Sequence, residues 1–230
     1  MAERPSQLTL SLPHQPQYGR DDFVVGPSNE AALRLIERWP DWPAPVVVLS
    51  GPPGCGKTHL AHIWAARAGA EVLSAGRLGA AGVGPGGALA VEDVDAGAIR
   101  EQLLFHLINS AKEAGAYLLV TSRRPAADWR VGLLDLRSRL RMAMPAAVAR
   151  PDDDLLRKVL VKLFADRQLI VDRTVIDYLL VRMERSLAAA LLLVEKLDRE
   201  SLAAASPITR PMVARVLTES RAAEEFSEPD

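Results

Sequence analysis

Residues 51–58 constrain the fold of this chain more than any other feature. They read Gly-Pro-Pro-Gly-Cys-Gly-Lys-Thr and satisfy the P-loop pattern G-x-x-x-x-G-K-[ST]. A short β-branched run, Val46 to Ser50, precedes them, and Leu60, Ile63 and Trp64 follow at helical spacing. Because strand, glycine loop and helix occur in this order, a phosphate-binding loop is a better interpretation than an ordinary turn between strand and helix.

The chemistry of this loop predicts a bound nucleotide with Mg²⁺. Gly51, Gly54 and Gly56 let the backbone approach the phosphates, and the helix that starts near Lys57 presents its positive dipole end to them. Lys57 neutralises the β and γ oxygens, and Thr58 offers a hydroxyl to Mg²⁺. The predicted nucleotide site is completed by Pro52, Pro53, Cys55 and His59.

Cys55 is the single cysteine of the 230 residues, so no disulfide framework exists, which is typical of a cytoplasmic protein. Its position beside Lys57 and a helix N-terminus allows a lowered thiol pKa. We favour the other interpretation, a small filler at a variable position of the loop.

Charge and hydropathy exclude several classes of partner. The net charge of −1 implies no sequence-independent grip on duplex nucleic acid. No apolar run approaches the length of a membrane span, and residues 1–20 lack the apolar region of a signal peptide. The length suits one ordinary domain with a smaller second one.

The pattern predicts an α/β domain over residues 21–150 and a small helical domain over residues 151–223. Strands alternate with helices before Pro151, which favours a parallel sheet covered by helices on both faces. Asp152 and Asp172 are good N-caps for two of the helices that follow. Residues 1–20 are predicted to be an extended arm, and residues 224–230 a disordered acidic tail. The predicted strands are 46–50, 71–74, 88–91 and 116–121, and helices are predicted at 29–38, 60–68, 98–112, after Asp152, after Asp172, at 186–200 and at 211–222.

Two strand ends carry polar residues that suit a P-loop ATPase, which needs a second acidic site for Mg²⁺ and for aiming water. Glu92 stands at the usual aspartate position, where it would hold Mg²⁺ together with Thr58, and Asp93 stands at the position of the catalytic acid. A solvated acidic turn is the less favoured alternative. Thr121 and Ser122 end the next strand, where a hydroxyl either reports the γ-phosphate or only caps the strand, and both interpretations stay open.

For two further features the local sequence favours a purely structural explanation over a functional one. Late in the α/β domain three arginines alternate with other residues: Arg137, Arg139 and Arg141. One of them is suited to reach the γ-phosphate of a neighbouring molecule, but a solvated basic face is the simpler interpretation. The arm contains a glutamine followed by spaced leucines, which either dock as a peptide into an apolar pocket or form a peripheral strand: Gln7, Leu8, Leu10 and Leu12.

Together these features resemble the DnaA-type branch of the AAA+ ATPases, and most closely its short Hda-like regulators, over nearly the whole chain. Residues 23–29 resemble the segment that packs near adenine, and residues 51–58 match Walker A. Residues 135–140 are similar to the box VII segment, with Arg139 in the arginine-finger position. In the same resemblance, Glu92 and Asp93 stand at Walker B and Thr121 and Ser122 at sensor 1. The helices after Pro151 are similar to the AAA+ lid, and residues 7–12 to the clamp-binding peptide.

The resemblance implies a negative regulator of DNA replication initiation that binds ADP or ATP with Mg²⁺. It implies capture by the DNA-loaded sliding clamp, the β subunit of DNA polymerase III, through the residues of the arm. Arg139 would then stimulate hydrolysis of ATP on the initiator DnaA, which is regulatory inactivation of DnaA. We expect no direct origin-sequence recognition, because the chain ends after the lid, and no membrane binding, because the arm has no basic amphipathic helix. Self-association is left open.

The resemblance also predicts weak or no intrinsic ATPase activity. The lid arginine called sensor 2 falls at Ala188, with Arg185 about one helical turn earlier, and Walker B departs from the usual aspartate. Two other functions stay open: an autonomous AAA+ ATPase such as a helicase loader, and a nucleotide-dependent clamp adaptor without finger activity. ATP turnover by the isolated chain would distinguish an autonomous ATPase from the regulator. A substitution of Arg139 without effect would distinguish the clamp adaptor from the regulator.

Overall fold

The computed structural model describes residues 18–78 and 83–225, which form two compact units. The sheet unit comprises Tyr18–Leu155 with Ser186–Ala188, and the helical unit comprises Leu156–Arg185 with residues 189–225. The predicted clamp-binding residues of the arm and positions 226–230 of the predicted tail lie outside the described residues.

The sheet unit is built on five parallel strands, which confirms the predicted parallel sheet and adds one strand to the four that the sequence predicted. Their order across the sheet is β2-β3-β4-β1-β5, so β1 lies between β4 and β5. Because all pairings are parallel, the carboxyl ends of all strands lie at one edge of the sheet. The strands are β1 (Val46–Ser50), β2 (Glu71–Ser74), β3 (Ala88–Glu92), β4 (Tyr117–Ser122) and β5 (Met144–Ala147).

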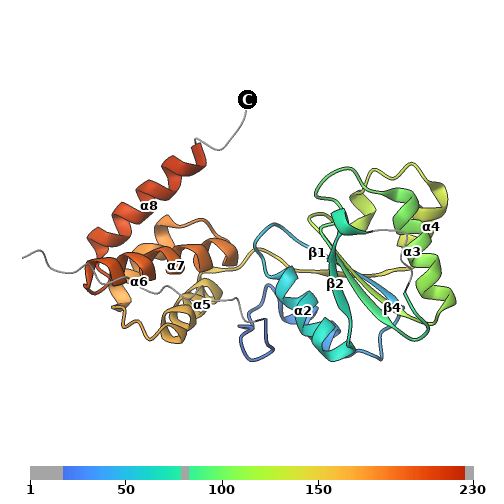
Figure 1. Ribbon diagram of the computed structural model, residues 1–230, viewed down its shortest axis with the longest axis horizontal. Helices are drawn as coiled ribbons and strands as arrows, with labels where there is room; N and C mark the ends of the chain where they lie inside the picture. Colours follow the sequence, from blue (N-terminus) through green and yellow to red (C-terminus); the bar gives the residue numbers. More distant parts are fainter. Residues whose placement is uncertain (1–17, 79–82, 226–230) are drawn as a thin grey trace, which may run out of the picture. The chain divides into compact units, whose positions relative to one another are not determined.

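Helices cover both faces of this sheet (Figure 1). One face packs against α1 (Glu30–Glu37) and α2 (Lys57–Ala68), and the other against α3 (Glu101–Glu113) and α4 (Leu134–Met142). Successive side chains of β1 enter the two cores in turn: those of 47 and 49 pack with α1 and α2, and those of 46 and 48 pack with α3 and α4. This double burial explains why the strand reads as a continuous apolar run. Two 3₁₀ turns, η1 (Ala75–Arg77) and η2 (Ala126–Asp128), join the elements.

The sequence did not predict α4 and β5. Because residues 134–142 are helical, the alternating arginines do not share one face: Arg137 and Arg141 are one turn apart, whereas Arg139 points elsewhere. The interpretation of these three arginines as one basic face is therefore wrong. β5 contains Pro145, which a strand at the edge of the sheet tolerates.

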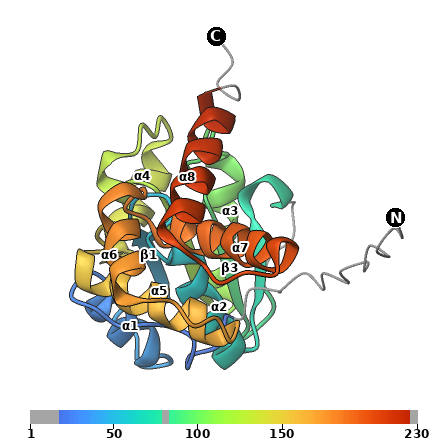
Figure 2. The same ribbon diagram turned by 90° about the vertical axis from the view of Figure 1, so that its left-hand side faces the viewer.

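The remaining four helices are α5 (Asp153–Asp166), α6 (Arg173–Arg182), α7 (Leu187–Ala204) and α8 (Arg210–Glu225) (Figure 2). Both predicted N-caps are confirmed. Asp152 Oδ1 accepts a hydrogen bond from the Leu155 N–H at 2.8 Å, and Asp172 Oδ1 accepts one from the Thr174 N–H at 2.7 Å. α8 extends past residue 222 and takes in residues 224 and 225, which the sequence assigned to the tail. The most deeply buried side chains of the helical unit include those of Leu156, Leu160, Phe164, Leu179, Val194, Leu197 and Val213.

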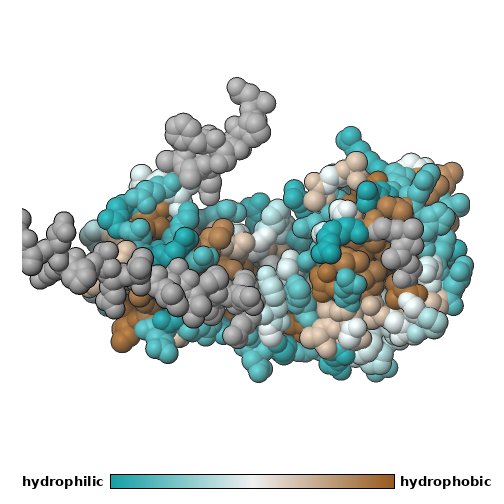
Figure 3. Space-filling model, viewed as in Figure 1, coloured by the Kyte–Doolittle hydropathy of each residue, from teal (hydrophilic) through white to brown (hydrophobic). Residues whose placement is uncertain are grey.

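The visible surface of the sheet unit contains both hydrophilic and apolar residues (Figure 3). Figure 3 shows hydrophilic side chains interspersed with apolar ones on the visible face of the sheet unit. Within the described ranges, every helix is too short or too polar to cross a membrane.

Candidate functional site

The P-loop joins β1 to α2 and is anchored on both neighbouring strands. The Gly51 N–H donates to the Ser122 carbonyl of β4 at 3.1 Å, and the Val148 N–H donates to the Ser50 carbonyl at 2.8 Å. A Cβ on Gly51 would lie 2.3 Å from the Val148 carbonyl oxygen. Only glycine therefore permits this approach of loop and strand.

Lys57 is the first residue of α2, and its side chain lies inside the curve of the loop. The residue is 6% exposed, and its Nζ donates to the carbonyl oxygens of Gly51 at 2.8 Å and Pro52 at 3.0 Å. Gly56 precedes it with φ 103° and supplies no side-chain cap, so the first N–H groups of α2 are available to an anion. The next residue, Thr58, is exposed to solvent. This arrangement fits phosphate oxygens.

Cys55 is 2% exposed, and burial raises the pKa of its thiol despite the nearby Lys57 ammonium, which acts to lower it. The interpretation of Cys55 as a low-pKa, reactive thiol is therefore wrong. The structure instead agrees with a small filler, since the space next to Gly51 holds the Cys55 Sγ.

Glu92 ends β3 next to β4, at the same edge as the P-loop. The register pairs Val91 with Val120, which sets Glu92 level with Thr121. Glu92 Oε1 is buried and accepts no hydrogen bond from the described residues. A buried carboxylate oxygen without a donor is a suitable ligand for a hard cation such as Mg²⁺.

Asp93 and the end of β4 are joined directly. Asp93 adopts a left-handed φ of 54°, and its N–H donates to Thr121 Oγ1 at 3.0 Å. Thr121 and Ser122 are both buried, and Ser122 Oγ donates to the Arg124 carbonyl at 2.7 Å. Both hydroxyls therefore have a structural role at the strand end, and the hydroxyl of Thr121 keeps its own proton to donate.

Asp95 is a site residue that sequence reasoning missed. Its side chain is 1% exposed and accepts hydrogen bonds from the N–H groups of Arg123 at 2.7 Å and Arg124 at 3.1 Å. It thus fixes the loop after β4 to the loop after β3. The available signal was a third acid directly after the apolar strand, but its partners lie 28 and 29 residues away.

His59 faces the segment that precedes α1. Its Nε2 donates to the Gly19 carbonyl at 2.8 Å, and its ring meets the edge of Phe23 at 5.0 Å. Asn29 holds this segment in shape, because its buried amide accepts from the Gly26 N–H and donates to the Val24 carbonyl. His59 therefore connects the P-loop helix to the segment expected near adenine.

Residues 186–188 belong to the sheet unit and lie against the P-loop. The Leu187 N–H donates to the Gly54 carbonyl at 2.7 Å, and a Cβ on Gly54 would lie 3.2 Å from that of Ala188. The residue at the expected sensor 2 position is thus beside the loop, and its side chain is a methyl group instead of a cation.

Arg139 lies on α4, the helix that precedes β5. It is half-buried, and no described residue forms a hydrogen bond or ion pair with its guanidinium. Two large apolar side chains of the same helix are strongly exposed, Leu134 at 71% and Met142 at 68%. α4 therefore carries an arginine without a partner among the described residues together with exposed apolar side chains.

The site fits a nucleoside phosphate with Mg²⁺. The loop presents backbone donors and an ammonium group, and Glu92 supplies an oxygen without a donor. Within residues 18–78 and 83–225 no cluster of three or more His, Cys, Asp or Glu side chains forms a metal site. Mg²⁺ needs no such cluster, because it takes one or two protein ligands besides phosphate oxygens and water.

Comparison with protein families agrees with this geometry. Residues 47–124 match the ATPase family associated with various cellular activities (AAA), and residues 152–217 match the lid domain of Hda. The two matches together cover more than half of the chain. They do not overlap: the first ends in the loop after β4, and the second begins at the N-cap of α5.

Solved structures share the fold at low sequence identity. Domain III of the Thermotoga maritima replication initiation protein DnaA superposes with a TM-score of 0.74 at 17% identity, over 90% of this chain and 98% of that one. AMPPCP-bound DnaA from Aquifex aeolicus gives 0.69 at 16% identity, over 90% and 71%. A variant of Thermotoga maritima RuvB gives 0.67 at 17% identity, over 88% and 72%. The chain therefore combines an AAA domain with an Hda lid domain, the domain composition of an Hda-like AAA+ protein.

Proposed function

We propose that this protein stimulates hydrolysis of ATP bound to the initiator DnaA by supplying Arg139 in trans, and so restrains replication initiation. The observation that carries the proposal is the guanidinium of Arg139, which has no partner among the described residues and lies on a helix with exposed apolar side chains. The match to the Hda lid domain supports DnaA as the partner. A permanently charged, planar guanidinium suits the oxygens of a phosphoryl-transfer transition state.

Adenine nucleotide on this chain has a structural role in the proposal. Lys57 and the N–H groups of α2 bind its phosphates, and Thr58 and Glu92 hold Mg²⁺. Hydrolysis on this chain is slow because no cation stands at Ala188. Bound Mg²⁺ would neutralise charge on the phosphate oxygens.

Recruitment in the proposal depends on the arm. Gln7, Leu8, Leu10 and Leu12 bind the sliding clamp on DNA, which raises the local concentration of this chain near DnaA. The arm and Arg139 therefore have separable roles: one recruits, the other acts at the triphosphate.

The test measures phosphate release from DnaA–ATP in the presence of DNA-loaded clamp, and from this chain alone. We expect strong stimulation with the wild-type chain, slow release from the chain alone, and loss of stimulation with Gln7→Ala unless the chain is added in excess. Rapid ATP turnover by the isolated chain, with no effect on DnaA, would contradict the proposal and favour an autonomous ATPase.

A further inference from the structure

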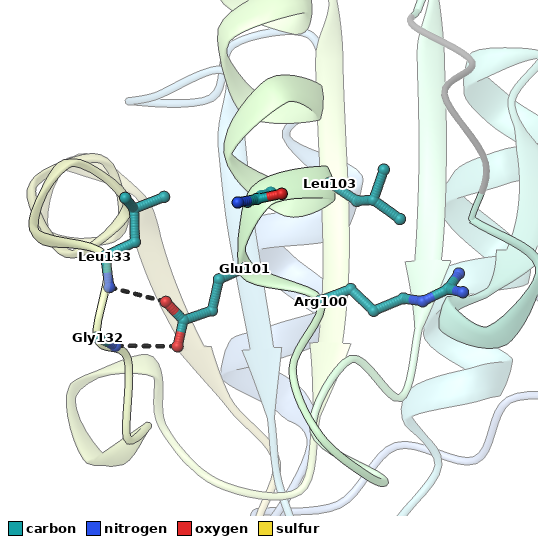
Figure 4. Close-up of a pocket in the computed structure, with 6 residues that line it drawn as sticks. Arg100, Glu101, Leu103, Gly132 and Leu133 are labelled. Carbon is teal, nitrogen blue, oxygen red and sulfur yellow. Dashed lines mark hydrogen bonds between the residues drawn. The ribbon is translucent and has the colours of Figure 1, made fainter.

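The helix that carries Arg139 is held at its start by a carboxylate from another helix. Glu101, the first residue of α3, accepts hydrogen bonds from the Gly132 N–H at 2.9 Å and the Leu133 N–H at 2.7 Å. Figure 4 shows one carboxylate oxygen facing each N–H, while Arg100 extends away from them. Arg100 instead donates to the Leu78 carbonyl at 2.9 Å. Both carboxylate oxygens of Glu101 thus accept hydrogen bonds at the start of α4.

α4 needs this external support. Its N-cap is Leu133, which has no side-chain acceptor, so the helix lacks the local cap that Ser, Thr, Asp or Asn would provide. At nine residues it is also too short to be stable without tertiary contacts. A carboxylate at the positive end of the helix dipole satisfies N–H groups and fixes where the helix begins.

The negative charge of the Glu101 carboxylate faces the partial positive charges of two backbone N–H groups. The N–H groups of Gly132 and Leu133 hold the pKa of Glu101 below its ordinary value, because both hydrogen bonds favour the ionised carboxylate. The pocket beside it, about 550 Å³ in volume, is lined by residues from the starts of the same two helices. The contact is therefore the polar link across an open part of the α3–α4 surface.

We infer that Glu101 is a positioning residue for Arg139: by fixing the N-cap Leu133 and the residue before it, Glu101 sets where α4 begins and so aims the guanidinium at the triphosphate of the partner. This inference rests on the proposed function. Arg139 lies six residues after Leu133, about 9 Å along the helix axis at 1.5 Å per residue. A helix transmits a displacement of its start to such a residue, and small misplacements at a reacting centre are costly.

The experiment compares Glu101→Ala, Glu101→Gln and the control Glu113→Gln, which alters an exposed carboxylate at the other end of α3. Amide hydrogen exchange is measured over residues 132–137, and stimulated hydrolysis is measured at saturating concentrations of each variant. We expect Glu101→Ala to raise exchange there and to lower the maximal stimulated rate by about tenfold or more, without altering the half-saturating concentration. Glu101→Gln keeps one acceptor oxygen and should fall between Glu101→Ala and wild type, whereas Glu113→Gln should match wild type.

Two results overturn the inference. One is unchanged exchange in Glu101→Ala, which would show that the contact does not hold α4. The other is raised exchange with an unchanged stimulated rate, which would show that the contact does not aim Arg139. If Glu101→Ala does not fold, Glu101→Gln decides by the same criteria. An unchanged rate in Arg139→Ala would instead contradict the proposed function, while the exchange data would still report on the contact.

Discussion

The N–H of Asp93 donates a hydrogen bond to the hydroxyl of Thr121 at 3.0 Å, which ties the end of β3 to the end of β4. This bond supports the left-handed backbone of Asp93 and sets the acids after β3 beside β4. Asp95 adds a second tie by accepting from the N–H groups of Arg123 and Arg124. The acidic end of β3 is thus preorganised by one contact with β4, the strand between β3 and the P-loop strand β1, and by a second set of contacts with the loop after β4.

Removing the Thr121 hydroxyl should weaken the fold measurably. We predict that Thr121→Val lowers the free energy of unfolding by about 1 kcal/mol, the net value of one such hydrogen bond. Valine keeps the β-branched shape, and Thr121→Ser keeps the hydroxyl as a control. Urea denaturation measures the difference, and a Thr121→Val protein as stable as wild type would show that the bond contributes nothing.

A side chain at Gly51 should weaken nucleotide binding. In Gly51→Ala the new methyl group would meet the Val148 carbonyl at 2.3 Å, so the loop must move. We predict that binding of a fluorescent ADP analogue weakens by more than about tenfold, since such overpacking costs about 1–3 kcal/mol. Gly76→Ala, with no atom within 4 Å of the new Cβ, is the control and should bind normally. Equal affinity of both variants would contradict the anchoring of the loop.

Cys55 should react slowly with thiol reagents. Burial raises the pKa of its thiol, so little thiolate is present at neutral pH, and the side chain is 2% exposed. We predict much slower labelling by iodoacetamide at pH 7 than for a free thiol, and fast labelling once urea unfolds the chain. Mass spectrometry follows the reaction, and rapid labelling of the folded protein would show that the thiol is activated.

Asp172 should make the stability of α6 depend on pH. Hydrogen bonds from Thr174, with a smaller effect of the Arg210 charge, lower the pKa of Asp172 in the folded state. A lowered folded-state pKa stabilises the fold above the ordinary aspartate pKa of about 3.9, and this contribution is lost as the pH falls through the folded value. We predict that Asp172→Asn, which keeps an N-cap, removes this part of the pH dependence. Urea unfolding of both proteins between pH 5 and about pH 3 tests it, and parallel curves would contradict it.

Much of the fold could be predicted because its signals are local. The P-loop is contiguous, β1 is a continuous apolar run because both its faces are buried, and Asp152 and Asp172 cap helices in their own sequence neighbourhood. α4 escaped prediction because its start depends on Glu101, 31 and 32 residues away, instead of on a local cap. β5 escaped it because it is short and contains Pro145.

In the candidate site, too, residues with a local sequence signal could be predicted, and residues whose role depends on distant partners could not. Glu92 could be named from the sequence because it ends an apolar strand after a P-loop, and the structure adds that its Oε1 has no donor among the described residues. The role of Asp95 could not be found, because it depends on N–H groups of the loop after β4. The proposed role of Arg139 also depends on a second molecule, and the described chain shows only a guanidinium that no described residue pairs with.

Single-turnover decay of labelled ATP on DnaA, with DNA-loaded clamp present, tests the central claim most directly. Arg139→Ala should lower the stimulated rate by about 10³-fold or to the unstimulated level, the scale of a missing arginine finger. Arg137→Ala, an exposed arginine two residues earlier on α4, should stimulate like wild type. If Arg139→Ala stimulates hydrolysis as well as Arg137→Ala does, Arg139 does not act at the triphosphate of DnaA.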